Sequence, residues 1–239
     1  MKFLVTGCYG FIGFNFINNL LLNHDDNLLI YGIDSLESSC SIKNKNLQIN
    51  NKNFIFFESN INQIDSLNLN NIDTLVNFAA ESHVDNSIYN PELFIDTNVK
   101  GTTKLLKFAI ENNIENFIHV STDEVYGSKQ EGFCIENDIF NPSSPYSASK
   151  ASAELIINSF KKTYNYEVKI VRPANNYGIY QQPEKLIPYS IAKLEKNEKI
   201  EIYGEGKNIR HWLNVNDTCS AIMTVLENGK KGEVYNIGS

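Results

Sequence analysis

TGCYGFIG, residues 6–13, places Gly7, Gly10 and Gly13 directly after a short apolar run and at the start of a helical pattern. Glycines at this spacing let the backbone turn tightly and bring the amide groups of a helix N-terminus against a pyrophosphate. The same glycines would also suit an ordinary turn between a strand and a helix. The octapeptide therefore predicts a strand, a turn and a helix, and it makes a dinucleotide site the hypothesis to follow.

A second apolar run, NLLIYGID, ends at Asp34, about twenty residues beyond the glycines. A carboxylate at this position accepts hydrogen bonds from the ribose hydroxyls of a bound dinucleotide. It also repels a 2′-phosphate, which favours NAD over NADP. The alternative is that Asp34 is only a turn residue at the end of its strand.

The rest of the chain repeats this alternation of short apolar runs and helical patterns. Helical spacing is clear in residues 11–22 and 98–111. Continuous apolar runs are typical of strands covered on both faces, so the alternation predicts an α/β fold with a doubly wound parallel sheet of the Rossmann type. The runs are KFLVTG, NLLIYGID, NFIFFES, DTLVNFAA, NFIHVST and EVKIVRP.

After VRPANNYG the pattern changes, and we expect two parts: a dinucleotide-binding domain in residues 1–172 and a small, apparently truncated substrate-binding lobe in residues 173–239. In the lobe we expect helices near residues 186–194 and 217–226 and a short strand at KIEIYG, residues 199–204. The polar stretch of residues 37–52 is expected to be a solvated surface loop.

The composition is typical of a soluble enzyme, and the widely separated cysteines make a reducing cytoplasm the simplest interpretation. The chain has 239 residues, of which 42% are hydrophobic, and its 28 acidic and 21 basic residues give a net charge of −7, which argues against a nucleic-acid surface. No segment approaches a transmembrane length, so we expect no membrane partner. The cysteines form no CxxC pair and predict neither a disulfide framework nor a metal site: Cys8, Cys40, Cys134 and Cys219.

PYSASKASAEL places Tyr146 and Lys150 four residues apart, on one face of a helix that Pro145 would help to start. A free tyrosine has a pKa of about 10 and is a poor base unless a neighbouring cation stabilises the phenolate. Lys150 and the positive charge of the cofactor would supply that stabilisation. The alternative is an amphipathic helix with an exposed lysine.

VSTDEVYGS delivers four polar residues, Ser121 to Glu124, at the end of an apolar run. The carboxyl ends of parallel strands face the crevice where ligands bind. Two buried adjacent carboxyls are hard to ionise together, so one of Asp123 and Glu124 can remain a proton donor while the other acts as a base. The alternative is a solvated turn of two acids.

Taken together, these motifs resemble the extended short-chain dehydrogenase/reductases, and among them the dTDP-glucose 4,6-dehydratases. The resemblance extends along nearly the whole chain. Sister families that epimerise or decarboxylate nucleotide sugars share the glycines, the tyrosine and the lysine but typically lack Thr-Asp-Glu, so the triplet favours dehydration. Further matching stretches are NFAAESHVDNSI, TNVKGT, RPANNYG, YQQPEKLIP, IYGEGKNIRHWL and YNIGS.

The resemblance implies a mechanism for making dTDP-4-keto-6-deoxyglucose and water, in a deoxysugar pathway of the rhamnose type. Tyr146, helped by Lys150 and Thr122, would take the proton of the C4 hydroxyl while the C4 hydride passes to NAD. Glu124 would then remove the C5 proton and Asp123 would protonate the departing C6 hydroxyl, before the hydride returns to C6. It also implies a homodimer, paired through helices in residues 98–111 and 146–164.

The binding residues implied by the resemblance fall into two sets. Lys185 and Arg210 could instead be surface cations that bind no ligand. His83 is expected to have a structural role. The cofactor set is Gly7, Gly10, Phe11, Ile12, Gly13, Asp34, Asn60, Ile61, Ala79, Ala80, Ser82, Asn98, Ser121, Tyr146 and Lys150. The set for the nucleotide diphosphate sugar is Ser82, Thr122, Asn176, Lys185, Leu186, Pro188 and Arg210.

The sequence also departs from the family pattern. The segment after Asp34 lacks the usual Leu-Thr-Tyr-Ala-Gly, and Asn60, His211 and Asn214 stand where aspartate, aspartate and tyrosine are usual. Family members continue well past YNIGS, so we expect an incomplete substrate lobe. Three rivals stay open: the same reaction on UDP-glucose, an epimerase, and a non-catalytic NAD-binding remnant.

Overall fold

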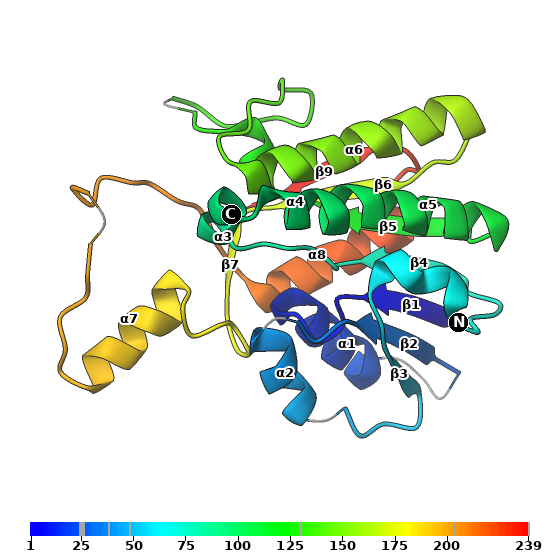
Figure 1. The fold of residues 1–239 in the computed structure, drawn as a ribbon, viewed down its shortest axis with the longest axis horizontal. Coiled ribbons are helices and arrows are strands. Elements are labelled where there is room, and N and C mark those ends of the chain that lie inside the picture. Colours follow the sequence, from blue (N-terminus) through cyan, green and yellow to red (C-terminus); the bar gives the residue numbers. More distant parts are fainter. Residues whose placement is uncertain (24–26, 38, 48, 130, 203, 239) are drawn as a thin grey trace.

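The computed structural model of the chain describes residues 1–23, 27–37, 39–47, 49–129, 131–202 and 204–238. Within these residues seven parallel strands form one sheet in the order β3-β2-β1-β4-β5-β6-β9 (Figure 1). The doubly wound parallel sheet predicted from the sequence is thus confirmed. Its strands are β1 (Lys2–Thr6), β2 (Leu29–Asp34), β3 (Phe54–Glu58), β4 (Thr74–Asn77), β5 (Asn116–Val120), β6 (Lys169–Pro173) and β9 (Val234–Ile237).

Helices cover both faces of this sheet, and each face has its own apolar layer. One layer packs the strands against α1 and α8 through residues such as Phe16 and Ile222. The other packs them against α5 and α6 through Leu105 and Ile157. The helices are α1 (Phe11–Asn23), α2 (Ser39–Asn46), α3 (Val84–Tyr89), α4 (Pro91–Phe94), α5 (Thr102–Glu111), α6 (Pro145–Tyr164), α7 (Leu186–Glu195) and α8 (Val215–Asn228).

Helix α6 has strong local signals at both ends. Ser144 is its N-cap and forms a reciprocal capping box with Ser147, and Pro145 occupies the first turn, where its missing amide hydrogen costs nothing. Asn165 ends the helix in the left-handed conformation. The sequence therefore fixes where α6 begins, and with it the position of every side chain that the helix presents to the sheet.

The predicted helix of residues 98–111 is present but has two parts. A π-helical turn, η2 (Ile95–Gly101), precedes α5, and two further turns, η1 (Ile61–Ser66) and η3 (Asp123–Tyr126), have 3-10 geometry. π-Turns inside helices are rare and are often found at functional sites. Here the turn contains Asn98, one of the residues predicted to lie near the cofactor.

Two local predictions were wrong. Residues 37–52 contain helix α2 rather than only a surface loop, and the buried side chain of Asn44 anchors this helix to the backbone of Tyr9. The predicted strand at residues 199–204 is not formed by its described residues, 199–202 and 204. A strand needs a neighbour to pair with, and in this region the pairing is instead between β7 (Asn175–Tyr177) and β8 (Trp212–Asn214).

The segment after residue 173 contributes to the main body as well as to a separate part. β9 pairs with β6, and α8 packs on α1. Figure 1 shows α7 standing apart from the body, and none of its side chains is buried. No helix in the described part of the chain has the length and apolar character needed to cross a membrane.

Candidate active site

The glycine loop between β1 and α1 cannot accept larger residues. Gly7 has a φ of +66°, and a Cβ added there would lie 2.7 Å from the Ala79 amide nitrogen. A Cβ on Gly13 would lie 2.2 Å from the Gly7 carbonyl oxygen. The backbone of this loop is therefore packed directly against the segment that follows β4, at the point where the strand order reverses, which is where α/β sheets bind ligands.

Asp34, at the end of β2, faces the glycine loop. Its buried carboxylate accepts hydrogen bonds from the backbone amides of Tyr9 at 3.0 Å and Leu36 at 2.9 Å. Burial raises the pKa of this carboxyl, and hydrogen bonds from Leu36, Tyr9, Ser41 and Gly10 oppose the shift. The carboxylate is thus held at the loop that would contact a pyrophosphate.

The segment after Asp34, which departs from the family pattern, also supports the glycine loop. The side chain of Asn44 in α2 donates a hydrogen bond to the Tyr9 carbonyl at 2.9 Å. The loop is consequently fixed from two directions, by Asp34 through the Tyr9 amide and by Asn44 through the Tyr9 carbonyl.

Asn60 and Ile61 lie next to each other but in different environments. The Asn60 side chain caps η1 by accepting a hydrogen bond from the Asn62 amide at 2.9 Å. Ile61 is buried in the apolar layer under α5, and its side chain fills the space beside Gly101. The side chain of Ile61 therefore belongs to the core.

Thr122, Asp123 and Glu124 form a compact turn directly after β5. Thr122 is buried and caps η3, since its hydroxyl accepts a hydrogen bond from the Glu124 amide at 3.2 Å. Burial raises the pKa of both Asp123 and Glu124, and the charge of Asp123 raises the pKa of Glu124 further. The charge of Arg210 opposes both shifts. This is the environment that lets one carboxyl donate a proton and the other accept one.

Tyr146 and Lys150 are buried on the face of α6 that meets this turn. Lys150 is 3% exposed and donates a hydrogen bond to the Val120 carbonyl at 2.8 Å. Burial lowers its pKa to about 8, against the opposing charge of Glu154. The pKa of Tyr146 is raised by burial and by the charge of Glu124, whereas a hydrogen bond with Thr122 lowers it. Tyr146, Thr122 and Glu124 thus converge on one place.

Asn98 joins the segment after β4 to helix α6. Its side-chain oxygen accepts a hydrogen bond from the Glu81 amide at 2.9 Å, and its nitrogen donates to the Ser149 hydroxyl at 2.8 Å. Ser149 in turn donates to the Tyr146 carbonyl at 2.7 Å. This network fixes Ala79, Ala80 and Ser82, which flank Glu81, relative to Tyr146.

The predicted nucleotide-binding residues are only partly brought together. Leu186 and Arg210 line one cavity of about 530 Å³ with Asn175, Asn208, Ile209 and Trp212. Lys185 stands at the N-terminus of α7, with Pro188 in its first turn. The side chain of Asn176 is occupied elsewhere, because its oxygen accepts a hydrogen bond from the Thr218 hydroxyl at 2.5 Å.

Two buried polar groups beneath the site were not predicted. The His119 ring lies with its Nδ1 atom 3.1 Å from Asn77 Nδ2, and burial lowers its pKa well below the usual value. Arg172 is buried against Glu154. Each is a lone polar residue inside an apolar run, in NFIHV and in KIVRP, and that interruption is the signal in the sequence that could have revealed them. Among the described residues, no cluster of His, Cys, Asp and Glu side chains could hold a metal ion.

The glycine loop, the acidic end of β2 and the paired tyrosine and lysine of α6 define a dinucleotide-binding enzyme of the short-chain dehydrogenase/reductase class. Residues 4–239 match the family model described as GDP-mannose 4,6 dehydratase. The chain belongs to this family of nucleotide-sugar 4,6-dehydratases, as its resemblance predicted.

Individual relatives agree with this assignment. The chain is 44% identical over its whole length to the low-salt glycan biosynthesis protein Agl12 of Haloferax volcanii, of which it covers 77%. It is 40% identical to dTDP-glucose 4,6-dehydratase of Streptomyces antibioticus and covers 72% of that protein.

Solved structures show the same similarity. The dTDP-glucose 4,6-dehydratase DesIV of Streptomyces venezuelae, crystallised with NAD and TYD, has a TM-score of 0.92 and 39% identity, with 99% of this chain and 75% of DesIV covered. A UDP-glucose 4-epimerase of Thermotoga maritima has a TM-score of 0.90 but only 29% identity, over 100% of this chain and 77% of the epimerase. The fold is therefore shared with epimerases, and the site residues must carry the distinction.

Proposed function

We propose that this chain is an NAD-dependent dTDP-glucose 4,6-dehydratase, which converts dTDP-glucose to dTDP-4-keto-6-deoxyglucose and water. The observation that carries the proposal is the contact between two motifs: the Thr122-Asp123-Glu124 turn lies against Tyr146, where Thr122 hydrogen-bonds to the phenol and the charge of Glu124 raises its pKa. Similarity of about 40% to dTDP-glucose 4,6-dehydratases supports the same reaction.

The residues around the glycine loop fit NAD. Gly7 and Gly13 leave no room for a Cβ, as a loop that receives a pyrophosphate against its backbone requires, and the Asp34 carboxylate beside it suits the ribose hydroxyls. When bound, NAD supplies the oxidation of the sugar at C4 and the matching reduction at C6. The remaining cofactor contacts proposed are Gly10, Phe11, Ile12, Asn60, Ile61, Ala79, Ala80, Ser82, Asn98 and Ser121.

In this proposal Tyr146 removes the proton from the C4 hydroxyl. Thr122 orients its phenol by a hydrogen bond. We assign to Lys150, one turn further along the same helix, the positive charge that would favour the phenolate when the cofactor and sugar are bound. Because the pKa of Lys150 is lowered to about 8, the lysine is still mainly cationic at neutral pH. The raised pKa of Tyr146 means that this stabilisation is needed, since the phenol would otherwise hold its proton.

The elimination step is assigned to the two carboxyls. Glu124 takes the proton from C5, and Asp123 gives a proton to the C6 hydroxyl, which leaves as water. The direction of both pKa shifts suits the two roles: a raised pKa favours the protonated form of Asp123 that gives the proton, and it makes Glu124 a stronger base for the proton of C5. A proton from solvent later replaces the one removed at C5, so that the net change is the loss of one water.

In this proposal most of the nucleotide diphosphate site lies in a substrate-binding lobe formed by residues 173–239. Arg210 and Lys185 are apt for a pyrophosphate, and their charges already act on Glu124 across the site. Leu186 and Arg210 share one cavity, which gives this group a common place in the fold. Ser82, Thr122, Asn176 and Pro188 complete the proposed set.

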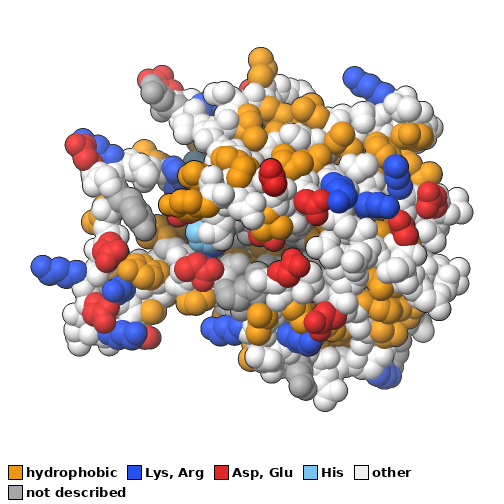
Figure 2. All heavy atoms as spheres, viewed as in Figure 1, with side chains coloured by type: hydrophobic (Ala, Val, Ile, Leu, Met, Phe, Trp, Pro, Cys, Tyr) orange, Lys and Arg blue, Asp and Glu red, His pale blue; other side chains and the backbone are white. Residues whose placement is uncertain are grey.

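We further propose that the protein is a cytoplasmic homodimer. Large apolar side chains are exposed on α3, α4, η2 and α6, and Figure 2 shows hydrophobic side chains gathered on the face that these helices form in Figure 1. A surface of this kind is typical of a protein interface. Sedimentation velocity should give a dimer, and a monomer at all concentrations would contradict the pairing. The exposed apolar residues of this proposed interface are Ile88, Tyr89, Leu93, Ile95 and Leu155.

The reaction is tested by incubating the purified chain and NAD with dTDP-glucose or with UDP-glucose and following each nucleotide sugar by mass spectrometry. We expect loss of one water from dTDP-glucose, and faster than from UDP-glucose. The double variant Asp123→Asn/Glu124→Gln is the control and should produce none. A chain that binds NAD but leaves both sugars unchanged would contradict the proposal.

A further inference from the structure

Arg172, the fourth of the five residues of β6, is a buried cation whose three nitrogens all donate hydrogen bonds. Its Nε and Nη2 atoms donate to the Glu154 carboxylate at 2.6 to 3.2 Å, and Nη1 donates to the Tyr126 hydroxyl and to the Glu136 carbonyl at 3.0 Å. The guanidinium carbon also lies over the rings of Tyr126 and Phe140, 4.9 Å from each centroid. A cation so fully enclosed can have only one arrangement of its partners.

The two main partners of Arg172 belong to the two elements that carry the chemistry. Glu154 is on α6, one turn beyond Lys150 and two turns beyond Tyr146, so all three share a face of the helix. Tyr126 is the last residue of η3, the turn that begins with Asp123 and Glu124. Arg172 therefore connects the helix of the tyrosine and lysine to the turn of the acid and the base.

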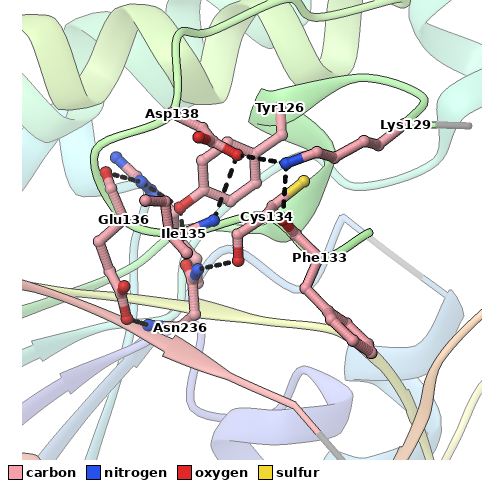
Figure 3. Close-up of polar contacts among 9 residues, drawn as sticks. Tyr126, Lys129, Phe133, Cys134, Ile135, Glu136, Asp138 and Asn236 are labelled. Atoms are coloured by element: carbon pink, nitrogen blue, oxygen red, sulfur yellow. Dashed lines mark hydrogen bonds and ion pairs between the residues drawn. The ribbon is translucent and has the colours of Figure 1, made fainter. Parts of the chain in front are cut away.

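The segment after η3 is fastened to the same point (Figure 3). The Tyr126 hydroxyl donates to the Asn236 side chain at 2.7 Å, and Asn236 in β9 donates to the Cys134 carbonyl at 3.2 Å. The backbone amide of Asn236 donates to the Glu136 carboxylate at 2.8 Å. The Tyr126 hydroxyl thus links two parts of this hydrogen-bond network. It accepts from Arg172 and donates to Asn236, which connects it to β9 and to the loop after η3.

We propose that Arg172 and Tyr126 form a clamp that positions the Asp123 and Glu124 turn against Tyr146, which makes both of them positioning residues for the elimination step. This inference rests on the proposed function. Neither residue belongs to the set expected to touch the sugar or the cofactor. The clamp matters because proton transfer at C5 and C6 requires both carboxyls in place, and a misplacement of about 1 Å can cost on the order of 100-fold in rate.

Tyr126→Phe is the informative variant. It removes only the hydroxyl and keeps the ring that the guanidinium lies over, whereas replacing Arg172 would leave the Glu154 carboxylate buried without a partner and could prevent folding. Tyr166→Phe is the matched control, because the Tyr166 hydroxyl also makes a short hydrogen bond, to the Ile114 carbonyl at 2.6 Å, far from the turn.

The first readout is hydrogen exchange followed by mass spectrometry, which needs neither substrate nor cofactor. We expect the amides of residues 121–128 to exchange roughly tenfold faster in Tyr126→Phe than in the unmodified chain, because the end of η3 has lost its anchor. Tyr166→Phe should leave these amides unchanged. Equal protection of residues 121–128 in all three proteins would overturn the clamp.

The second readout separates the elimination from the oxidation. In Tyr126→Phe turnover should fall about tenfold, and the kinetic isotope effect of substrate deuterated at C5 should grow relative to that of substrate deuterated at C4. A fall in rate with both isotope effects unchanged would mean general damage and would overturn the proposal. If the unmodified chain removes no water from the sugar, the proposed function has failed, and hydrogen exchange alone decides the clamp.

Discussion

Asp123 and Glu124 are adjacent and half-buried, and keeping two carboxyls in this place costs folding stability. Burial raises the pKa of each carboxyl, and their mutual repulsion adds to the shift of Glu124. A carboxyl whose pKa is raised by folding binds its proton more tightly in the folded than in the unfolded chain. It therefore costs stability, and this cost grows as pH rises from the ordinary carboxyl pKa through the raised one.

Glu124→Gln should abolish the loss of water and at the same time stabilise the protein at neutral pH. The gain arises because the amide cannot ionise, and it should disappear below the ordinary glutamate value of 4.5, where the carboxyl is protonated in both states. Urea denaturation at several pH values measures it. The exposed Glu111→Gln is the control and should show no gain, and a Glu124→Gln protein less stable than the unmodified chain at neutral pH would contradict the expectation.

Gly13→Ala tests the tight packing of the glycine loop. A Cβ there would lie 2.2 Å from the Gly7 carbonyl, so the loop must move, at a cost of about 1–3 kcal/mol in the free energy of unfolding. We expect NAD binding, measured by calorimetry, to weaken at least about tenfold because the backbone contacts of the pyrophosphate are displaced. Gly238→Ala, which would meet no atom within 4 Å, should change neither quantity. NAD affinity unchanged in Gly13→Ala would contradict this role.

The residues that could be predicted are those whose type and spacing together are typical of one chemistry. Glycines in the first loop, an acid at the end of the second strand and the pair Tyr146 and Lys150 belong to this group. His119 and Arg172 could not be assigned roles in this way, because their partners come from distant segments: Asn77 is 42 residues from His119, and Tyr126 is 46 residues from Arg172.

Helix α6 brings Tyr146, Lys150 and Glu154 to the site, and it can do so only if its first turn is fixed. The capping box between Ser144 and Ser147 satisfies amides that would otherwise lack partners at that end. The capped first turn thus stabilises α6 and also fixes the position of Tyr146, the second residue of the helix.

Ser144→Ala should cost about 1 kcal/mol in the free energy of unfolding, because the Ser147 amide loses its acceptor. Ser159→Ala on the exposed side of the same helix is the control and should stay within about 0.5 kcal/mol of the unmodified chain. Thermal or urea denaturation measures both. Equal effects of the two substitutions would show that the cap contributes nothing specific.

Strands and helices could be predicted from the sequence where a single local pattern dominated. The six strands predicted from continuous apolar runs are all present in the sheet, because those runs left no competing pattern. Residues 199–204 have a strand composition but no partner strand among the described residues, and pairing is a property of the surroundings that local sequence does not contain. The π-turn before α5 and the addition of β9 to the sheet depend in the same way on tertiary contacts.

The whole chain joins its first and last segments around one crevice. β1 supplies the glycine loop, and β9, from residues 234–237, supplies Asn236 to the clamp behind η3. The proposed nucleotide-binding residues are more dispersed: Asn176 bonds to α8, whereas Leu186 lies on a helix without a buried side chain. The residues proposed for oxidation and elimination are therefore assembled in this structure more completely than those proposed for nucleotide binding.

The most direct measurement is the reaction of the chain and NAD with dTDP-glucose in deuterium oxide, followed by mass spectrometry and nuclear magnetic resonance. We predict a product that lacks one water and carries one deuterium at C5, because the proton removed there by Glu124 is replaced from the solvent. An unchanged nucleotide sugar, or a 4-epimer that keeps its C6 hydroxyl and contains no deuterium on carbon, would contradict the assignment of this chain as a dehydratase.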